Sequence, residues 1–298
     1  MIKSLFNAIP GTPARVAIFM SGAGSNADAL LRYCAENPDC NYISALLVTD
    51  SPKTSRAGAI SAEWGIPLIE HDIRAFYAER GESVIALTSE RRREIRAEWT
   101  DVLRQMLLPC KIDFGVLAGF VPLCNITKTL PCLNVHPGDL TIERDGRRIF
   151  AGLHFRPVEN AILAGNAVLR SSVILAQPFK GGGEREMDSG PILGVSRPVP
   201  IELGDETIES LTAVMNSRTV APYCDKLREV ATFNLERLKI LGDHVVLPQV
   251  VDDFAGGKFG IDEHGQLYFK GNSHSNSELS WTSCRTVEYD RDSRRIWR

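Results

Sequence analysis

The sequence predicts an α/β protein built on a doubly wound, mostly parallel sheet. Through the first 120 residues, apolar segments of strand length alternate with segments of helical periodicity, which is typical of repeated strand, helix, strand units. The segment 111–120 is a continuous apolar run, which is typical of a parallel strand covered by helices on both faces. A chain of 298 residues is long enough to bury the core of such a sheet.

Each element of the first half follows from a local pattern. The run at 42–49 is β-branched and apolar, and the helix at 55–64 ends at Gly65, which readily adopts a left-handed helix end. The helix at 88–108 has apolar residues three and four apart, which leaves Arg91 to Arg93 on its solvent face rather than at a phosphate. In chain order we expect a strand from residue 15, a helix to about residue 34, strand 42–49, helix 55–64, strand 66–69, helix 88–108 and strand 111–120.

Helices dominate after residue 200. Asp205 is the expected N-cap of a helix over 204–216, and helical spacing continues through 223–241. The end of the chain is polar and rich in serine, with an alternating stretch at 281–289 that predicts an edge strand. We therefore expect a domain over 1–271, with a helical insertion at about 205–242, and a polar C-terminal extension over 272–298.

Composition excludes several classes of function. A formal net charge of -3 gives no electrostatic reason to expect binding to nucleic acid. The longest apolar run, 114–124, is well short of the roughly 20 residues that a membrane helix needs. Seven cysteines without a C-x-x-C pair, and histidines without metal spacing, predict reduced thiols, a cytoplasmic protein and no metal site.

The first strand meets its helix at a corner that contains Gly22, Gly24, Ser25 and Asn26. Backbone N–H groups at the start of a helix bind phosphate, and glycines allow the ligand to approach. The pattern also fits a dinucleotide fingerprint, because Asp50 ends the next strand where a ribose would need a carboxylate. The side chains of Ser25 and Asn26 favour a phosphate monoester, and a turn needed only for packing is the third alternative.

Two later stretches suggest acyl-transfer chemistry. Asn134 and His136 are two residues apart after a short apolar strand, so their side chains project to the same side. Asp188 stands in a glycine-rich loop before another apolar segment. An amide and an imidazole can stabilise the oxyanion that forms when an amine attacks a carbonyl, and the carboxylate can take up the amine's proton.

In their order along the chain, the motifs SGAGSN, VLAGF, LNVHP, AGLH, DSGPIL and DHVVLPQVVDDFAGGKF resemble those of the folate-dependent formyltransferases. The resemblance extends from Arg15 to about Gly271. It implies a Rossmann-like formyltransferase fold and transfer of a formyl group from the co-substrate 10-formyltetrahydrofolate to a primary amine. The acceptor that it implies is 5'-phosphoribosylglycinamide, an intermediate of purine biosynthesis.

The resemblance also implies roles for individual residues. Asn134, His136 and Asp188 correspond to the catalytic trio. Gly24, Ser25 and Asn26 correspond to the substrate phosphate site, and Asp243 to a residue that contacts the substrate ribose. The implied folate-binding residues are Leu117, Ala118, Gly119, Phe120 and Val121.

The sequence departs from the family's pattern at several points near the folate and acceptor sites. The family's HPSLLP reads HPGDLT here, Pro122 replaces a basic residue, and Asp243 is shorter than the family's Glu. A helical stretch at roughly 217–238 is added before Asp243. The insertion at 142–150 predicts a solvated hairpin, with contact of Arg147 or Arg148 to a ligand as the alternative.

Other functions stay open at this point. The acceptor is alternatively another amine, such as a nucleotide amino sugar, or water, as in a formyltetrahydrofolate hydrolase. A nicotinamide-dependent oxidoreductase and a catalytically silent binding protein are the further alternatives. We expect small-molecule substrates, no nucleic-acid or membrane partner, and consider a homodimer as the assembly.

Overall fold

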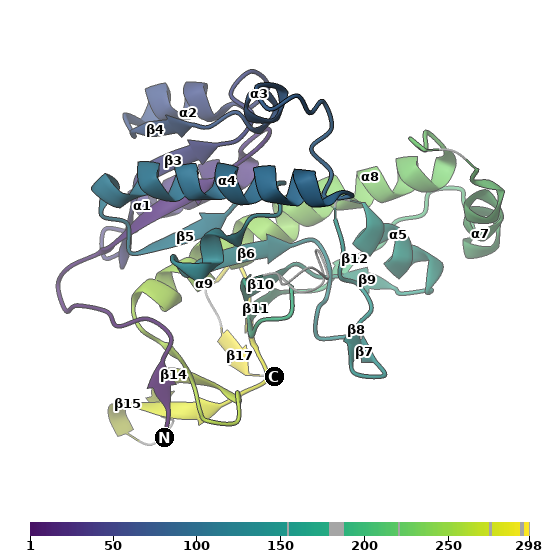
Figure 1. The fold of residues 1–298 in the computed structure, drawn as a ribbon. Coiled ribbons are helices and arrows are strands. Elements are labelled where there is room, and N and C mark those ends of the chain that lie inside the picture. The colour runs from purple at the N-terminus through teal and green to yellow at the C-terminus, as the bar shows by residue number, and fades with distance from the viewer. Residues whose placement is uncertain (154, 179–187, 220, 274–275, 293–294, 298) are drawn as a thin grey trace.

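A mixed sheet runs through the middle of the molecule (Figure 1). The computed structural model describes all residues except 154, 179–187, 220, 274–275, 293–294 and 298. In the described part of the chain this sheet has nine strands. From one edge to the other they are β17 (Arg295–Trp297), β16 (Val287–Tyr289), β11 (Ile192–Ser196), β10 (Ser172–Leu175), β6 (Cys132–His136), β5 (Phe114–Leu117), β2 (Ala14–Phe19), β3 (Tyr42–Thr49) and β4 (Leu68–Glu70).

The half of the sheet from β6 to β4 is parallel throughout. Strand β10 is antiparallel to both β6 and β11, β16 runs parallel to β11, and β17 is antiparallel to β16. The predicted doubly wound, mostly parallel sheet is therefore confirmed. Since parallel strands that share a direction end at one edge, β2, β5 and β6 bring their following loops together there.

Helices cover both faces of the sheet and extend beyond one end of it (Figure 1). The α-helices are α1 (Ser25–Glu36), α2 (Ala57–Trp64), α3 (Ile73–Ala78), α4 (Glu90–Leu107), α5 (Arg156–Leu163), α7 (Ile208–Ser217), α8 (Lys226–Leu238) and α9 (His244–Ala255). Short 3₁₀ segments are η1 (Leu108–Cys110) and η2 (Asn125–Lys128), and a π-helical turn, η3 (Lys239–Asp243), joins α8 to α9.

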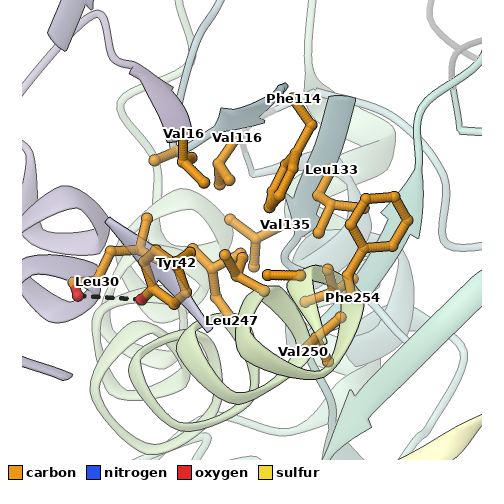
Figure 2. Close-up of a cluster of buried hydrophobic side chains, with 14 of the residues drawn as sticks. Val16, Leu30, Tyr42, Phe114, Val116, Leu133, Val135, Leu247, Val250 and Phe254 are labelled. Carbon is orange, nitrogen blue, oxygen red and sulfur yellow. Dashed lines mark hydrogen bonds between the residues drawn. The ribbon is translucent and has the colours of Figure 1, made fainter. Parts of the chain in front are cut away.

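Alternate residues of the strands build two cores. Val16 and Ile18 of β2 belong to the core beneath α1 and α9, whereas Ala17 and Phe19 belong to the core beneath α3 and α4. Figure 2 shows the first of these, in which strand valines and Phe114 pack on Leu247, Val250 and Phe254 of α9. The period of two along β2 thus explains why the strand is apolar throughout.

A third core lies in the helical region at the end of the sheet, where α5, α7 and α8 pack on one another. The same region contains a buried carboxylate, Glu159, which accepts hydrogen bonds from Arg218 and Arg228. These guanidinium groups hold the pKa of Glu159 below its ordinary value in spite of burial. The predicted helical insertion therefore packs on α5 and has a core of its own.

Several predicted boundaries agree with the structure and others do not. The strand at 42–49 and the helix at 88–108 are confirmed as β3 and α4. Asp205 is not the cap of α7; Thr207 is, because its hydroxyl accepts from the Ser210 N–H in a capping box. The stretch 281–289 is not one edge strand, since its two ends belong to β15 and β16 in different sheets.

The C-terminal region completes both sheets. Strands β13 (Phe259–Ile261), β14 (Leu267–Ser273) and β15 (Asn276–Ser283) form an antiparallel sheet with β1 (Lys3–Ser4). The boundary placed at 271 falls within β14, and from beyond it Val287 and Tyr289 are fully buried in the central core. The small pairs β7 (Glu143–Arg144) with β8 (Arg147–Arg148), and β9 (Val168–Leu169) with β12 (Val199–Pro200), complete the strands. Among the described helices, none is long and apolar enough to cross a membrane.

The Phe254 ring joins α9 to the sheet, and its removal tests this packing. It is 1% exposed and lies edge-to-face on Phe114 at 5.0 Å between centroids. Phe254→Ala is expected to lower the free energy of unfolding by about 3–5 kcal/mol, because the cavity is deep in the core. Urea unfolding measures this. The control is Phe233→Ala, a ring 51% exposed on α8, which should cost less than about 1 kcal/mol; equal losses would contradict the packing described.

Candidate active site

The glycine-rich corner lies between β2 and α1. Gly24 has φ 75° and precedes the first helical residue, Ser25, and no side chain caps the helix. The backbone angle of Gly24 favours glycine, and a Cβ there would also displace the ends of two side chains, Ile60 Cδ1 at 2.5 Å and Met20 Cε at 2.6 Å. The N–H groups of the first turn of α1 are left without a side-chain acceptor, which makes the corner suited to an anion.

Three side chains converge beside this corner. Asn134 and His136 project from β6, and Asp188 comes from the loop before β11. Asn134 Nδ2 lies 3.3 Å from Asp188 Oδ1, and His136 Nδ1 lies 3.6 Å from Asp188 Oδ2. Both His136 and Asp188 are buried, with 3% and 7% of their surfaces exposed. The structure thus brings together the three residues for which catalytic roles are predicted from the sequence.

The hydrogen bonds of His136 fix which nitrogen faces Asp188. Its Nε2 lies 2.7 Å from the carbonyl oxygen of Phe150. A carbonyl accepts only, so Nε2 carries a proton and donates it. Nδ1 is consequently the nitrogen directed at Asp188.

Burial raises the pKa of the Asp188 carboxyl above its ordinary value. The charge of His136, the amide of Asn134 and the charge of Arg148 act in the opposite direction. A carboxylate with raised proton affinity is a better general base than an exposed one, provided that it stays ionised at the working pH.

A cavity of about 430 Å³ joins the corner to the three side chains. All the residues assigned to phosphate and folate by resemblance line it, from Gly24 to Asn26 and from Leu117 to Val121. Phe120 packs edge-to-face on Phe19, which gives this wall an aromatic surface. One pocket therefore has an anion site, an apolar wall and the polar trio.

Helix α8 and the π turn supply lining residues that the sequence analysis did not assign. Glu236 and Lys239 border the cavity, and Lys239 Nζ lies 2.5 Å from Glu236 Oε1. The helical spacing of this stretch is visible in the sequence, but no local signal indicates that its end reaches the glycine corner. That placement depends on how the helical region packs on α5.

Asp243 is buried rather than presented to the cavity. It is 4% exposed, accepts a hydrogen bond from Asn26 Nδ2 at 3.1 Å, and accepts another from the Ser171 hydroxyl. Burial raises its pKa. Its two oxygens are thus engaged by the protein, and it does not line the cavity with the residues assigned to phosphate and folate. The ribose role implied for Asp243 remains a prediction that this geometry does not favour.

Asp50 has a similar internal role. It is 3% exposed, and its oxygens accept hydrogen bonds from the hydroxyls of Ser21 and Ser51. Burial raises its pKa. A nicotinamide ribose needs this carboxylate to face the ligand, and here it does not border the cavity. Among the described residues there is also no group of three or more His, Cys, Asp or Glu that would hold a metal ion.

Comparison with known proteins gives a fold. No protein-family model matches the chain, and no curated protein does. Phosphoribosylglycinamide formyltransferase from Anaplasma phagocytophilum matches with a TM-score of 0.56 and 20% identity, over 88% of this chain and 97% of that one. Glycinamide ribonucleotide transformylase 1 from Symbiobacterium toebii matches with 0.54 and 21%, over 87% and 97%.

A formyltetrahydrofolate deformylase from Pseudomonas syringae also matches, with a TM-score of 0.51 and 13% identity over 85% of this chain and 65% of that one. The chain therefore has the formyltransferase fold, as the motifs predicted. At these identities the likeness concerns the fold, and the acceptor has to be argued from the site.

The buried pair of Asn26 and Asp243 yields a stability prediction. Asp243→Ala removes the acceptor of a buried amide, so the free energy of unfolding should fall by about 1–3 kcal/mol in urea unfolding. Asp243→Asn should cost less, because its carboxamide oxygen still accepts from Asn26. Unchanged stability of Asp243→Ala would show that the carboxylate does not hold Asn26 and would restore the ribose role as the better explanation.

Proposed function

We propose that this protein transfers the formyl group of 10-formyltetrahydrofolate to the primary amine of a small phosphorylated acceptor, and that this acceptor is 5'-phosphoribosylglycinamide. The observation that carries the proposal is the convergence of Asn134, His136 and Asp188 in a cavity that also borders the glycine corner. Solved proteins of the same fold whose names specify this acceptor support it.

The two substrates have distinct places in this proposal. The acceptor phosphate binds the N–H groups at the start of α1, where the helix dipole favours an anion, and Lys239, which is ion-paired with Glu236, lies at the cavity wall. The folate lies against the segment 117–121, where the aromatic ring of Phe120 suits a flat heterocycle. The formyl carbon and the amine then meet beside His136 and Asp188.

The reaction begins when the lone pair of the amine attacks the formyl carbon. The carbonyl oxygen becomes an oxyanion, which the Asn134 amide and the His136 imidazole stabilise. The tetrahedral intermediate collapses with cleavage of the bond between the formyl carbon and folate N10, which takes up a proton. The formylated amine and tetrahydrofolate are the products.

Asp188 receives the proton that the attacking amine loses, either directly or through a water molecule. Its other carboxylate oxygen lies 3.6 Å from His136 Nδ1, so Asp188 also helps to orient the imidazole beside the formyl group. One carboxylate thus acts on both the nucleophile and the oxyanion.

Incubation of the purified protein with 10-formyltetrahydrofolate tests this function. With 5'-phosphoribosylglycinamide present, absorbance should report tetrahydrofolate and mass spectrometry the formylated acceptor. Folate turnover with release of formate and no need for an acceptor would identify water as the acceptor and a hydrolase as the function. No turnover, together with a fluorescence change on titration with NADH, would replace the proposal by a nicotinamide-dependent activity.

Asp188→Asn is expected to lower kcat on the order of 10²-fold or more, because the carboxamide cannot accept the proton that the attacking amine loses. Steady-state rates at saturating substrates measure this. The control is Asp101→Asn, an exposed carboxylate on α4 whose side chain is 66% accessible. A variant at 188 that retains the wild-type rate would remove Asp188 from the mechanism.

The raised pKa of Asp188 predicts a dependence on pH. Its ionised form is the active one, and burial moves its titration above the ordinary carboxyl value of 3.8. As the pH falls, kcat/KM should therefore decline with a midpoint above 3.8, and this decline should disappear in Asp188→Asn. Initial rates across the acid range test it; the same acid limb in the variant would assign it to another group.

A further inference from the structure

We propose that the hairpin formed by β7 and β8 braces the catalytic pair, with Arg148 as the residue that positions Asp188. The effect of Arg148 on catalysis rests on the proposed function, whereas the contacts of Arg148 with the loop do not. The sequence analysis expected this insertion to be a solvated hairpin, with ligand contact as the alternative. The structure points to a third role, directed at the protein's own loop.

The turn of the hairpin determines which residues face the site. Asp145 and Gly146 have φ of 51° and 69°, as the two central residues of a type I′ turn do. The register pairs Glu143 with Arg148. The Arg148 side chain is 18% exposed, whereas Arg147 next to it is an exposed residue. Adjacent arginines on one short strand thus have opposite surroundings, because successive side chains point to opposite faces.

The guanidinium of Arg148 binds the backbone on either side of Ser189. It donates to the carbonyl oxygens of Asp188 and Gly190, the latter at 2.8 Å. Both acceptors are backbone carbonyls of the protein, so the Arg148 guanidinium binds the loop and not a ligand. The guanidinium is a rigid planar fork that holds two carbonyls in a fixed geometry, whereas the donors of a lysine ammonium rotate on a flexible stem.

The opposite side of this loop rests on β10. A Cβ at Gly190 would lie 1.9 Å from the carbonyl oxygen of Leu175, so the loop backbone is in direct contact with that strand. Leu175 N also donates to the carbonyl of Pro191 at 3.1 Å. The loop is therefore held between a strand and a guanidinium, and the Asp188 carboxylate follows from that backbone position.

The same segment also orients His136. Two residues after Arg148, the Phe150 carbonyl accepts from His136 Nε2, and it passes so near Gly138 that a Cβ there would lie 2.7 Å from it. This explains why HPGDLT has glycine after the proline. The chain from 147 to 150 thus contacts both members of the buried pair, one through a side chain and one through a carbonyl.

The electrostatic surroundings give a readout that a purely structural role would not change. Among the residues that the structure describes, the charged groups facing Asp188 are His136 from β6 and Arg148 from β8, and Asn134 faces it as a neutral donor. Glu143 and Arg285 face Arg148 in turn. Since the charge of Arg148 lowers the pKa of Asp188, its removal should move the acid limb of the pH profile to higher pH.

The test compares Arg148→Ala and Arg148→Lys with Arg147→Ala in the full chain. Arg148→Ala should lower kcat on the order of 10- to 100-fold with little change in KM, because a small misplacement of a reacting group has effects of this size. Arg148→Lys should recover only part of the rate, and free guanidinium should partly restore Arg148→Ala. Arg147→Ala should stay within about twofold of wild type.

Hydrogen exchange of the peptide 188–193 separates this inference from the proposed function, since it needs no activity. It should be faster in Arg148→Ala than in wild type or Arg147→Ala. If wild type transfers no formyl group but exchange still responds, the proposed function fails and the brace stands. The brace is overturned if Arg148→Ala has the same kcat, pH profile and hydrogen exchange as wild type. It is also overturned if both alanine variants lose activity and guanidinium does not restore it.

Discussion

The burial of one carboxylate beside an imidazole is the constraint on which the site depends. Asp188 is 7% exposed, and an ion so far from water is stable only when other groups replace its hydration. Asn134 and His136 lie against the carboxylate oxygens of Asp188, and Arg148 donates a hydrogen bond to its backbone carbonyl. The groups come from β6 and from a hairpin 40 residues before Asp188, so the proton affinity of one side chain depends on how separate elements pack.

The sheet provides the frame for this arrangement. Strands β2, β3 and β5 end at the same edge, and a buried carboxylate ties their loops together. Asp50 follows β3 and accepts from Ser21 after β2, whose hydroxyl in turn accepts from the Val121 N–H after β5 at 2.9 Å. The residue that would bind ribose in a dinucleotide enzyme thus fixes the walls of the cavity here. Its role is to hold the glycine corner against the segment 117–121.

Sequence patterns predicted the elements whose cause is local. The apolar run of β3, the periodicity of α4 and the left-handed end of α2 at Gly65 depend on nearby residues, and Asn134 with His136 follows from the period of two along β6. Contacts between distant segments had no such signal. Nothing near Arg148 indicates that its guanidinium reaches two carbonyls 40 and 42 residues later. Likewise, the pairing of Asn26 with Asp243 joins residues 217 apart and turns an expected ligand contact inward.

The burial of the Asp243 carboxylate limits what the glycine corner can recognise in a ligand. With Asp243 committed to Asn26 and Ser171, the corner offers backbone N–H groups, which recognise an anion and little else. Under the proposed function, charged side chains elsewhere on the cavity wall would contribute to the choice among phosphorylated amines, and α8 with its π turn supplies Glu236 and Lys239 there. An extra residue in a π turn shifts the register of the helix that follows. The same turn that brings Lys239 to the cavity also leaves Asp243 buried against Asn26 and Ser171.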